Sequence, residues 1–346
     1  MEFCEYKANR NKIVFTKKIR ILSGGTVAGK KESEGPLKDY FDETFEDALF
    51  GEKSFERAES LMCKKAMKYA LSKANITEEC IDFIIAGDLM NQCTGAGYGL
   101  ADYDIPYLGI YGACSTFAEG LMIGAMLIES GCANTVAVAA SSHFCSAERQ
   151  FRFPLAYGSF GSSTAQNTVT GAGCIILCNK DILERNDKDA IYITEALPGI
   201  VVDRGITDAA NMGAAMCSAA ADTIERYCEG NYETLSNFDF VSTGDLGWEG
   251  VRLLTDLLRN NSPFPEEKIR DCGLIVYDIK NQNVGLGGSG CGCSAIVTAG
   301  YFLEEFKKGN LKKIGLIGTG AMMSPKSVDQ GESIPGIGHM ITICRE

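Results

Sequence analysis

The sequence predicts an α/β fold made of two similar halves, in a duplicated five-layer αβαβα arrangement. Strand-like runs rich in β-branched residues alternate with amphipathic stretches along the whole chain, which is typical of sheets covered by helices. In addition, segment 81–89 (IDFIIAGDL) resembles segment 238–246 (FDFVSTGDL). Internal repetition of this kind indicates a duplicated unit, here with pseudo-twofold halves. An ordinary doubly wound sheet is the alternative that these patterns leave open.

Ten short runs are expected to form strands. In chain order they are 19–24, 81–88, 107–113, 134–141, 171–179, 192–200, 238–245, 272–278, 312–320 and 339–345. Apolar residues recur at spacings of three and four in three further segments, which predicts amphipathic helices there. These segments are 55–73, 212–227 and 247–259.

A second pair of segments, 111–141 and 288–320, also matches in layout. Each reads as a turn of small residues, a helix, a glycine stop and a buried strand. Small residues allow the two helix N-termini to approach each other closely, so a ligand site is expected where the halves meet. The polar run LERNDKD lies between them, and we place the halves at 1–180 and 190–346.

Composition narrows the function classes. The formal net charge of −12 argues against a nucleic-acid binder and against direct adhesion to anionic lipid. We see no signal peptide and no apolar run long enough to span a bilayer, so the protein is expected to stay on the side of the membrane where it is made. The 15 cysteines are scattered through apolar segments and are expected to be reduced and mostly structural. Their spacing predicts no metal site.

Cys114 is the residue best placed for chemistry. It lies in YGACSTFAEG, after an apolar strand and at the start of a helix expected to run to about Glu129. The helix dipole and nearby backbone N–H groups favour the thiolate, which is the form a nucleophile needs. A buried structural cysteine fits the local pattern equally well.

A family resemblance makes this pattern specific. The phrases EGPLKDYFD, AGDLMNQ, YGACSTFAEGLMIGAMLI, AERQFRFPL, TAQNTVTGAG, STGDLG, GGSGCGCSAIV and QGESIPGIGH resemble, in order and spacing, the stage V sporulation protein AD (SpoVAD) family. Similar phrases cover nearly the whole chain. The resemblance implies the thiolase-like fold of thiolases and ketoacyl-ACP synthases, and a homodimer paired through first-half sheet edges.

It also implies a function. Members of this family are expected to bind dipicolinic acid or its calcium complex, and to support its uptake into the developing spore together with other stage V sporulation membrane proteins. The expected location is peripheral, at the cytoplasmic side or surface of the forespore or spore inner membrane. No cofactor is expected, apart from calcium that accompanies the ligand.

The resemblance places Cys114 where the condensing enzymes carry their acyl-accepting nucleophile. Those enzymes also need imidazole or amide donors from the second half, because condensation builds negative charge on an enolate oxygen. At the corresponding places this chain has Thr243 and Asp245 in STGDLG, and Ser289 and Cys291 in GGSGCGCSA. We therefore expect no condensing activity.

Several other side chains are candidates for ligand binding. Both histidines of the chain, His143 and His339, are included, although a structural role fits each of them as well. Arg149 and Arg152 could hold carboxylates beside aromatic neighbours, or could simply be surface arginines. The complete set of predicted ligand-binding residues is Cys114, His143, Arg149, Arg152, Gln166, Asp245, Ser289 and His339. Asp88 and Asp245, matched by the repeat, could orient donors, approach calcium or cap helices.

The chain departs from the usual family pattern in one loop. Where the family usually has a Pro-Pro pair before TAQ and a Trp shortly after it, this chain has Ser162, Ser163 and Asn167. The ligand preference of a pocket lined by this loop would differ accordingly. Besides a dipicolinate-binding protein, two functions stay open: an acyl-CoA or acyl-carrier acyltransferase that uses Cys114, and a scaffold for a spore membrane complex.

Overall fold

A computed structural model describes residues 12–151, 162–179, 189–259 and 264–346. Within them, ten strands form one sheet in the order β10-β9-β12-β13-β8-β1-β7-β5-β3-β4. Their bounds are β1 Ile13–Ala28, β3 Phe83–Gly87, β4 Tyr107–Gly109, β5 Thr135–Ser142, β7 Gly171–Asn179, β8 Ile191–Leu197, β9 Phe240–Thr243, β10 Ile269–Asp271, β12 Lys313–Ala321 and β13 Gly336–Arg345. The short β2 (Glu43–Thr44) pairs with β1, and β6 (Asn167–Thr168) pairs with β11 (Gly288–Ser289).

The strand order repeats on the two sides of the junction between β1 and β8. Going outward, β1, β7, β5, β3 and β4 mirror β8, β13, β12, β9 and β10. On each side the first two pairs are antiparallel and the next two are parallel. The predicted fold class is therefore confirmed. The exact boundary between the halves stays a prediction, because residues 180–188 lie outside the described part of the chain.

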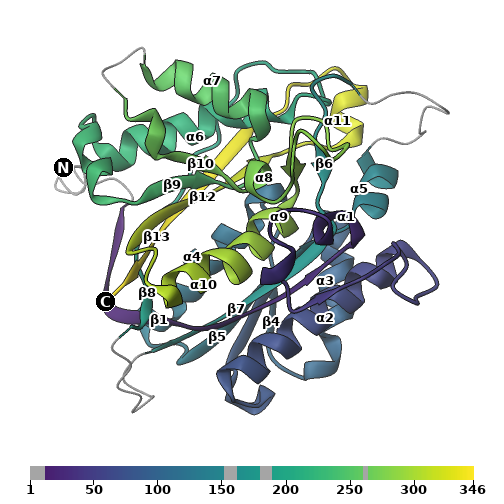
Figure 1. Cartoon of the computed structure of the whole chain (residues 1–346), viewed down its shortest axis with the longest axis vertical. Coiled ribbons are helices and arrows are strands. Elements are labelled where there is room, and N and C mark those ends of the chain that lie inside the picture. The colour runs from purple at the N-terminus through teal and green to yellow at the C-terminus, as the bar shows by residue number, and fades with distance from the viewer. Residues whose placement is uncertain (1–11, 152–161, 180–188, 260–263) are drawn as a thin grey trace, which may run out of the picture.

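Helices fill three layers around the strands (Figure 1). The central layer holds α4 (Thr116–Ser130) and a continuous helical stretch made of α9 (Cys291–Ile296), a π-helical turn and α10 (Leu303–Lys308). Helix α4 contacts β5 and β3 of the first half and β12 and β13 of the second. One outer layer holds α2 (Phe55–Ala74) and α3 (Thr94–Leu100), and the other holds α6 (Met212–Cys228) and α7 (Gly247–Arg259).

The three amphipathic helices begin and end where the sequence predicts, within one residue. Their ends have local causes: the Ser54 side chain accepts a hydrogen bond from the N–H of Arg57 at the start of α2, and Asn75 ends that helix in the left-handed conformation. Gly131 ends α4 in the same way, with a φ of 80°.

One predicted strand is wrong. Segment 272–278 does not form a strand: its first residues form α8 (Cys272–Ile275), and the strand β10 lies just before it. The side chain of Asp271 accepts a hydrogen bond from the N–H of Leu274, 3.1 Å away, and so starts a helical turn. A short apolar run does not by itself distinguish a strand from a buried helix.

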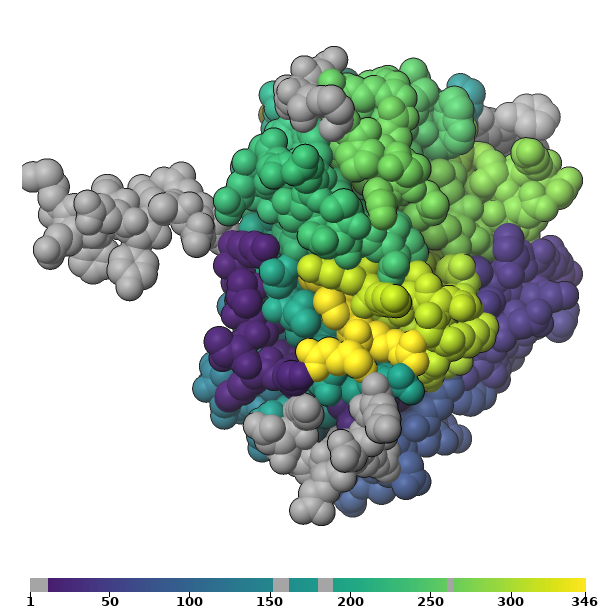
Figure 2. Space-filling view, turned by 60° about the vertical axis from the view of Figure 1, so that its left-hand side comes forward, coloured from purple at the N-terminus to yellow at the C-terminus, as the bar shows by residue number. Residues whose placement is uncertain are grey.

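Buried apolar side chains form three clusters that match the layers. The largest lies between the two halves of the sheet and includes Phe117, Leu121 and Ile296. The other two lie under α2 and under α6. On the face shown in Figure 2, the start of β1 (purple) and the end of β13 (yellow) lie near each other, and Lys18 of β1 forms an ion pair with Glu346.

The remaining short α-helices are α1 (Lys30–Ser33), α5 (Phe144–Phe151) and α11 (Pro325–Asp329). Across the described ranges, no helix is long and apolar enough to cross a membrane.

The 14 cysteines that the structure describes form no disulfide.

The contact between β1 and α2 gives a first prediction. A Cβ added at Gly25 would lie 2.1 Å from the carbonyl oxygen of Ala66 in α2, so Gly25→Ala must push backbone apart. We expect it to lower the free energy of unfolding by about 2 kcal/mol in urea titrations. The control is Gly97→Ala in α3, where nothing lies within 4 Å and where alanine should stabilise the helix by up to about 1 kcal/mol. Equal effects of the two changes would contradict this packing.

Candidate functional site

Cys114 lies in a turn that connects β4 to α4. The turn is held by its own hydroxyl groups: Ser115 Oγ donates to the carbonyl oxygen of Gly112 at 2.7 Å, and Thr116 Oγ1 donates to that of Ala113 at 2.7 Å. Ala113 has a φ of 52°, a left-handed conformation that is uncommon for alanine. The predicted position of the thiol at the start of a helix is thus confirmed, with the regular helix beginning two residues later.

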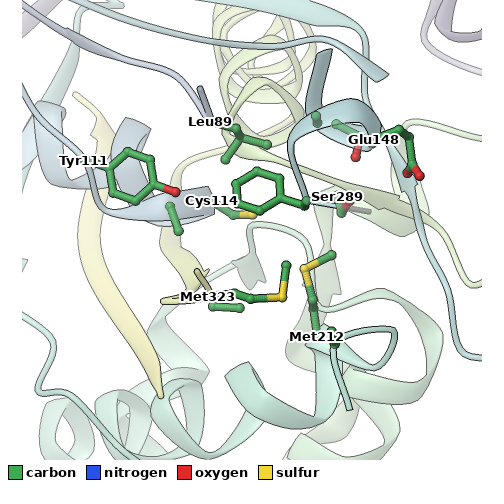
Figure 3. Close-up of a pocket in the computed structure, with 13 residues that line it drawn as sticks. Leu89, Tyr111, Cys114, Glu148, Met212, Ser289 and Met323 are labelled. Atoms are coloured by element: carbon green, nitrogen blue, oxygen red, sulfur yellow. The ribbon is translucent and has the colours of Figure 1, made fainter. Parts of the chain in front are cut away.

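The thiol forms part of the wall of a cavity that we call the Cys114 cavity (Figure 3). The cavity encloses about 500 Å³, its open mouth included. Residues from both halves line it, and most of them are apolar. They are Leu89, Tyr111, Ala113, Cys114, Ala147, Glu148, Phe151, Thr168, Ala209, Met212, Ser289, Ala321 and Met323. No lysine, arginine or histidine is among these described lining residues.

Asp245 lies behind the thiol and is fully buried. Its Oδ1 accepts a hydrogen bond from Thr319 Oγ1 at 2.8 Å, and its Oδ2 accepts one from the N–H of Gly290 at 2.8 Å. The Cys114 thiol also interacts with this carboxyl group. Burial raises the pKa of Asp245 to about 7, although these hydrogen bonds act in the opposite direction. The carboxyl group therefore takes up a proton much more readily than an exposed aspartate does.

The loop that carries Asp245 is itself fixed by a second buried carboxylate. Asp271 accepts hydrogen bonds from Thr243 Oγ1 at 2.6 Å, from the N–H of Leu246 at 2.8 Å and from the N–H of Gly247 at 3.1 Å. These contacts hold the backbone on both sides of Asp245. Asp271 therefore positions Asp245 and does not itself line the cavity.

The sequence leaves a nucleophilic thiolate and a buried structural cysteine open, and the surroundings of Cys114 favour the neutral thiol. Burial raises the pKa of Cys114 well above its ordinary value, and the nearby Asp245 carboxyl raises it further. The N–H of Gly290 lowers it, but by less. The desolvation of a thiolate and its repulsion by a carboxylate thus outweigh the helix dipole. At neutral pH the side chain is a neutral thiol.

Two more predicted residues lie close to this pair. Ser289 lines the cavity. Gln166 lies just behind the wall, where its Nε2 donates to the carbonyl oxygens of Asp245 and Gly288, each at 2.9 Å. The structure therefore brings Cys114, Asp245, Ser289 and Gln166 together, and their ligand contacts stay predictions.

The other predicted residues lie elsewhere. His143 is buried, its Nε2 lies 2.8 Å from the carbonyl oxygen of Ala48, and burial lowers its pKa. Nδ1 of His339 accepts a hydrogen bond from the N–H of Gly199 at 3.0 Å, and burial lowers its pKa to about 4. Arg149 forms an exposed ion pair with Glu56.

None of these three side chains lines the Cys114 cavity, and both histidine rings have backbone partners. Arg152 lies outside the described residues.

Asp88 accepts hydrogen bonds from the N–H groups of Met90 and Ala96, each at 2.7 Å, so it supports the backbone around α3. Among the described residues no group of three or more His, Cys, Asp or Glu side chains is arranged to hold a metal ion.

Sequence reasoning missed several lining residues, among them Glu148, Met212 and Met323. In Figure 3 the two methionines lie on the side of the cavity opposite Leu89. Met212 is the first residue of α6, and Met323 follows β12. Both positions carry a signal that the sequence offers: Met212 starts a predicted helix and Met323 follows a predicted strand. Ligand sites form at such ends in α/β folds.

Comparison with known proteins decides the family. The model of the family described as "Stage V sporulation protein AD (SpoVAD)" matches residues 9–344. Stage V sporulation protein AD of Bacillus subtilis (strain 168) is 40% identical over 332 residues, which are 96% of each chain. The chain belongs to the SpoVAD family.

Solved structures agree on the fold of this SpoVAD chain. A variant of OleA from Xanthomonas campestris matches with a TM-score of 0.62 and 14% identity, covering 96% of this chain and 100% of that one. The 3-oxoacyl-[acyl-carrier-protein] synthase III of Aquifex aeolicus VF5 matches with a TM-score of 0.54 and 17% identity, covering 94% and 99%. At this identity they show a thiolase-like fold.

The Cys114–Asp245 contact gives a second prediction. In Asp245→Asn the carboxylate no longer opposes the thiolate, so the pKa of Cys114 should fall. We expect iodoacetamide to modify Cys114 at pH 7.5 about tenfold faster for each unit by which the pKa of Cys114 falls. Peptide mass spectrometry follows the modification. The half-buried Cys145 in the same samples is the control and should keep its rate. Unchanged alkylation of Cys114 would show that Asp245 does not control the thiol.

Proposed function

We propose that this SpoVAD chain binds dipicolinate as its calcium complex in the Cys114 cavity, and that it supports uptake of this compound into the developing spore. Family membership over nearly the whole chain supports the assignment. The observation that carries the calcium complex is the composition of the cavity wall. Its described part is mostly apolar and contains no lysine, arginine or histidine, and the Asp245 carboxyl lies behind the thiol.

A free dicarboxylate is a poor ligand for such a cavity. Two negative charges would lose hydration in a space whose described lining is mostly apolar and contains no lysine, arginine or histidine. The complex of dipicolinate with one calcium ion carries no net charge. Calcium also accepts additional oxygen ligands, and carboxylate and hydroxyl oxygens of Glu148, Thr168 and Ser289 are present in the wall.

The condensing reaction is not part of this proposal. Neither histidine lines the cavity, and the Cys114 thiol is neutral at pH 7. A general base and a stabilised oxyanion are both needed to form and use an enolate. The described lining offers Glu148 as its only ionisable carboxylate and no imidazole for these tasks.

We also propose that the chain forms a homodimer and associates with membrane proteins. β4 ends the sheet, and its Tyr107 and Leu108 are 38% and 40% exposed, so this edge is available to pair with a second copy in a homodimer. An acidic chain whose described helices cannot span a bilayer would reach the spore inner membrane through other stage V sporulation membrane proteins. A scaffold role in that complex is compatible with ligand binding.

Calorimetric titration tests the ligand. We expect saturable binding of dipicolinate with equimolar calcium, and at least about tenfold weaker binding when calcium is removed by a chelator. Met212→Trp should abolish binding because the indole ring fills the cavity. Met126→Trp, the same change at a position that is 44% exposed on α4, should leave it unchanged. No binding under either condition, or equal loss in both variants, would refute the assignment.

Intact-mass measurement tests the alternative acyltransferase. In that reaction the Cys114 sulfur would attack the acyl carbonyl, and the thiolate of coenzyme A would leave and take up the proton that the thiol loses. The chain would therefore gain the mass of one acyl group less one hydrogen. We expect no adduct with acetyl-CoA or lauroyl-CoA at pH 7, because the thiol is protonated. An adduct that forms in the wild type and is absent from Cys114→Ala would establish the acyl-enzyme function.

A further inference from the structure

A second cleft is lined by residues of α1 and of the start of α5. These two helices lie near each other in Figure 1. We call this second cleft the Lys31 cleft; it encloses about 710 Å³, its open mouth included, and its lining is Gly29, Lys30, Lys31, Glu32, Glu34, Asp47, Ala48, Phe50, Phe144, Cys145, Asn167 and Thr170. No residue is shared with the Cys114 cavity. The segment 167–170 separates the two, because Thr168 lines the cavity while Asn167 and Thr170 line the cleft.

Glu32 is an unusual residue in this wall because it is only 1% exposed. Its Oε1 accepts hydrogen bonds from the N–H of Thr170 at 3.0 Å and from the hydroxyl group of Tyr277. Its Oε2 is buried and has no hydrogen-bond partner among the described residues. This oxygen points along Gly29, where an added Cβ would lie 2.8 Å from it. A buried, unpartnered carboxyl oxygen at a cleft wall indicates a missing partner.

Burial raises the pKa of Glu32, which favours the neutral acid, while hydrogen bonds from Tyr277, from the N–H of Thr170 and from its own backbone N–H, together with the charge of Lys31, act in the opposite direction. In the neutral form Oε1 keeps its two donors, and the proton belongs on Oε2. Oε2 then offers an O–H donor beside Gly29. Such a donor is suited to a carboxylate or carbonyl oxygen of a ligand.

Lys31 supplies the positive charge. Its ammonium group donates to Asn167 Oδ1 at 2.9 Å and to the carbonyl oxygen of Asn283 at 3.2 Å, and it lies 5.6 Å from the centre of the Phe144 ring. An ammonium group has three N–H donors, so one remains for a ligand. Because the other two contacts fix its position, little side-chain entropy is lost on binding.

Two aromatic rings give the cleft an apolar wall. Phe144 is 37% exposed, and Phe50 is buried with a φ of 55°, in the left-handed region. The Asp47 carboxylate holds this turn by accepting hydrogen bonds from the N–H groups of Leu49 and Phe50, at 2.7 and 2.9 Å. Asp47 stays negatively charged, and Glu34, Lys30 and Lys31 are the other charged groups in the lining besides Glu32.

We propose that the Lys31 cleft is a second ligand site, which takes a small monocarboxylate with a flat apolar body. Lys31 and Glu32 hold the carboxylate, and the rings of Phe50 and Phe144 contact the body. The site is separate from the Cys114 cavity and does not depend on the function proposed for that cavity.

Nuclear magnetic resonance with three probes of the same size tests this site. Benzoate, benzylamine and benzyl alcohol are titrated into the full chain labelled with 15N-phenylalanine. We expect benzoate to shift the amide signals of Phe50 and Phe144 but not that of Phe151, which lines the other cavity. Benzylamine and benzyl alcohol should bind at least about tenfold more weakly, because they lack the negative charge.

Two variants locate the contact. Lys31→Met removes the ammonium group and should weaken benzoate binding at least about tenfold, whereas Lys68→Met, at an exposed position of α2, should not change it. Gly29→Ala adds a Cβ 2.8 Å from Glu32 Oε2 and from Thr170 Cγ2, so it must displace this part of the wall without changing charge, and it should weaken binding similarly. Met212→Trp, which fills the Cys114 cavity, should leave benzoate binding intact. The proposal is overturned if benzylamine binds as well as benzoate, if only Phe151 shifts, or if no signal moves.

Discussion

The geometry of the candidate site depends on one buried carboxyl group, that of Asp245. It accepts hydrogen bonds from Thr319 at the end of β12 and from Gly290 before α9, and it receives the thiol of Cys114 from the first half. Segments that are far apart in the sequence are thereby joined at a single group. A buried carboxyl group without partners costs several kcal/mol, so the native fold requires these segments to meet there. The back wall of the Cys114 cavity follows from this requirement.

Glycines in β12 make that meeting possible. A Cβ at Gly320 would lie 2.4 Å from the carbonyl oxygen of Gly112, and one at Gly318 would lie 3.0 Å from that of Ser115. The turn that carries Cys114 therefore rests directly on the backbone of the second half. This contact explains why the two repeats both show runs of small residues at these places: the halves approach closely enough to share a site only where side chains are absent.

Much of the fold could be predicted from the sequence, because it follows from patterns that are local or repeated. The helices at 55–73, 212–227 and 247–259 follow from apolar spacing, and the duplicated strand order follows from the repeated segments. The segment 272–278 was misassigned because its outcome depends on the capping side chain of Asp271 and on burial from all sides. Neither is visible in the periodicity of a short apolar run.

The site was less predictable, because sequence position does not tell which way a side chain points. Cys114 follows β4, Asp245 follows β9 and Ser289 lies in the short β11, and the fold brings the three together with Gln166 beside them. His143 also follows a strand, β5, yet its ring packs against Phe55 and bonds to Ala48 on the other side of segment 167–170. The protonation state of a side chain is equally hard to predict from its position in the sequence. A helix start favours a thiolate when water can reach it, but Cys114 is 5% exposed and faces a carboxyl group, so desolvation and repulsion determine its protonation.

The loss of imidazole changes what such a cavity can do. In a condensing enzyme a histidine donates to the developing enolate, and a nearby thiolate attacks the acyl group. Here the position behind the thiol holds an acid with a pKa of about 7, which interacts with the thiol and does not polarise a carbonyl group. A neutral thiol beside an acid whose pKa is raised by burial forms a wall of low charge. Under the proposed function, such a wall suits the capture of a neutral complex better than the formation of an anionic intermediate, because the former requires no buried charge to be stabilised.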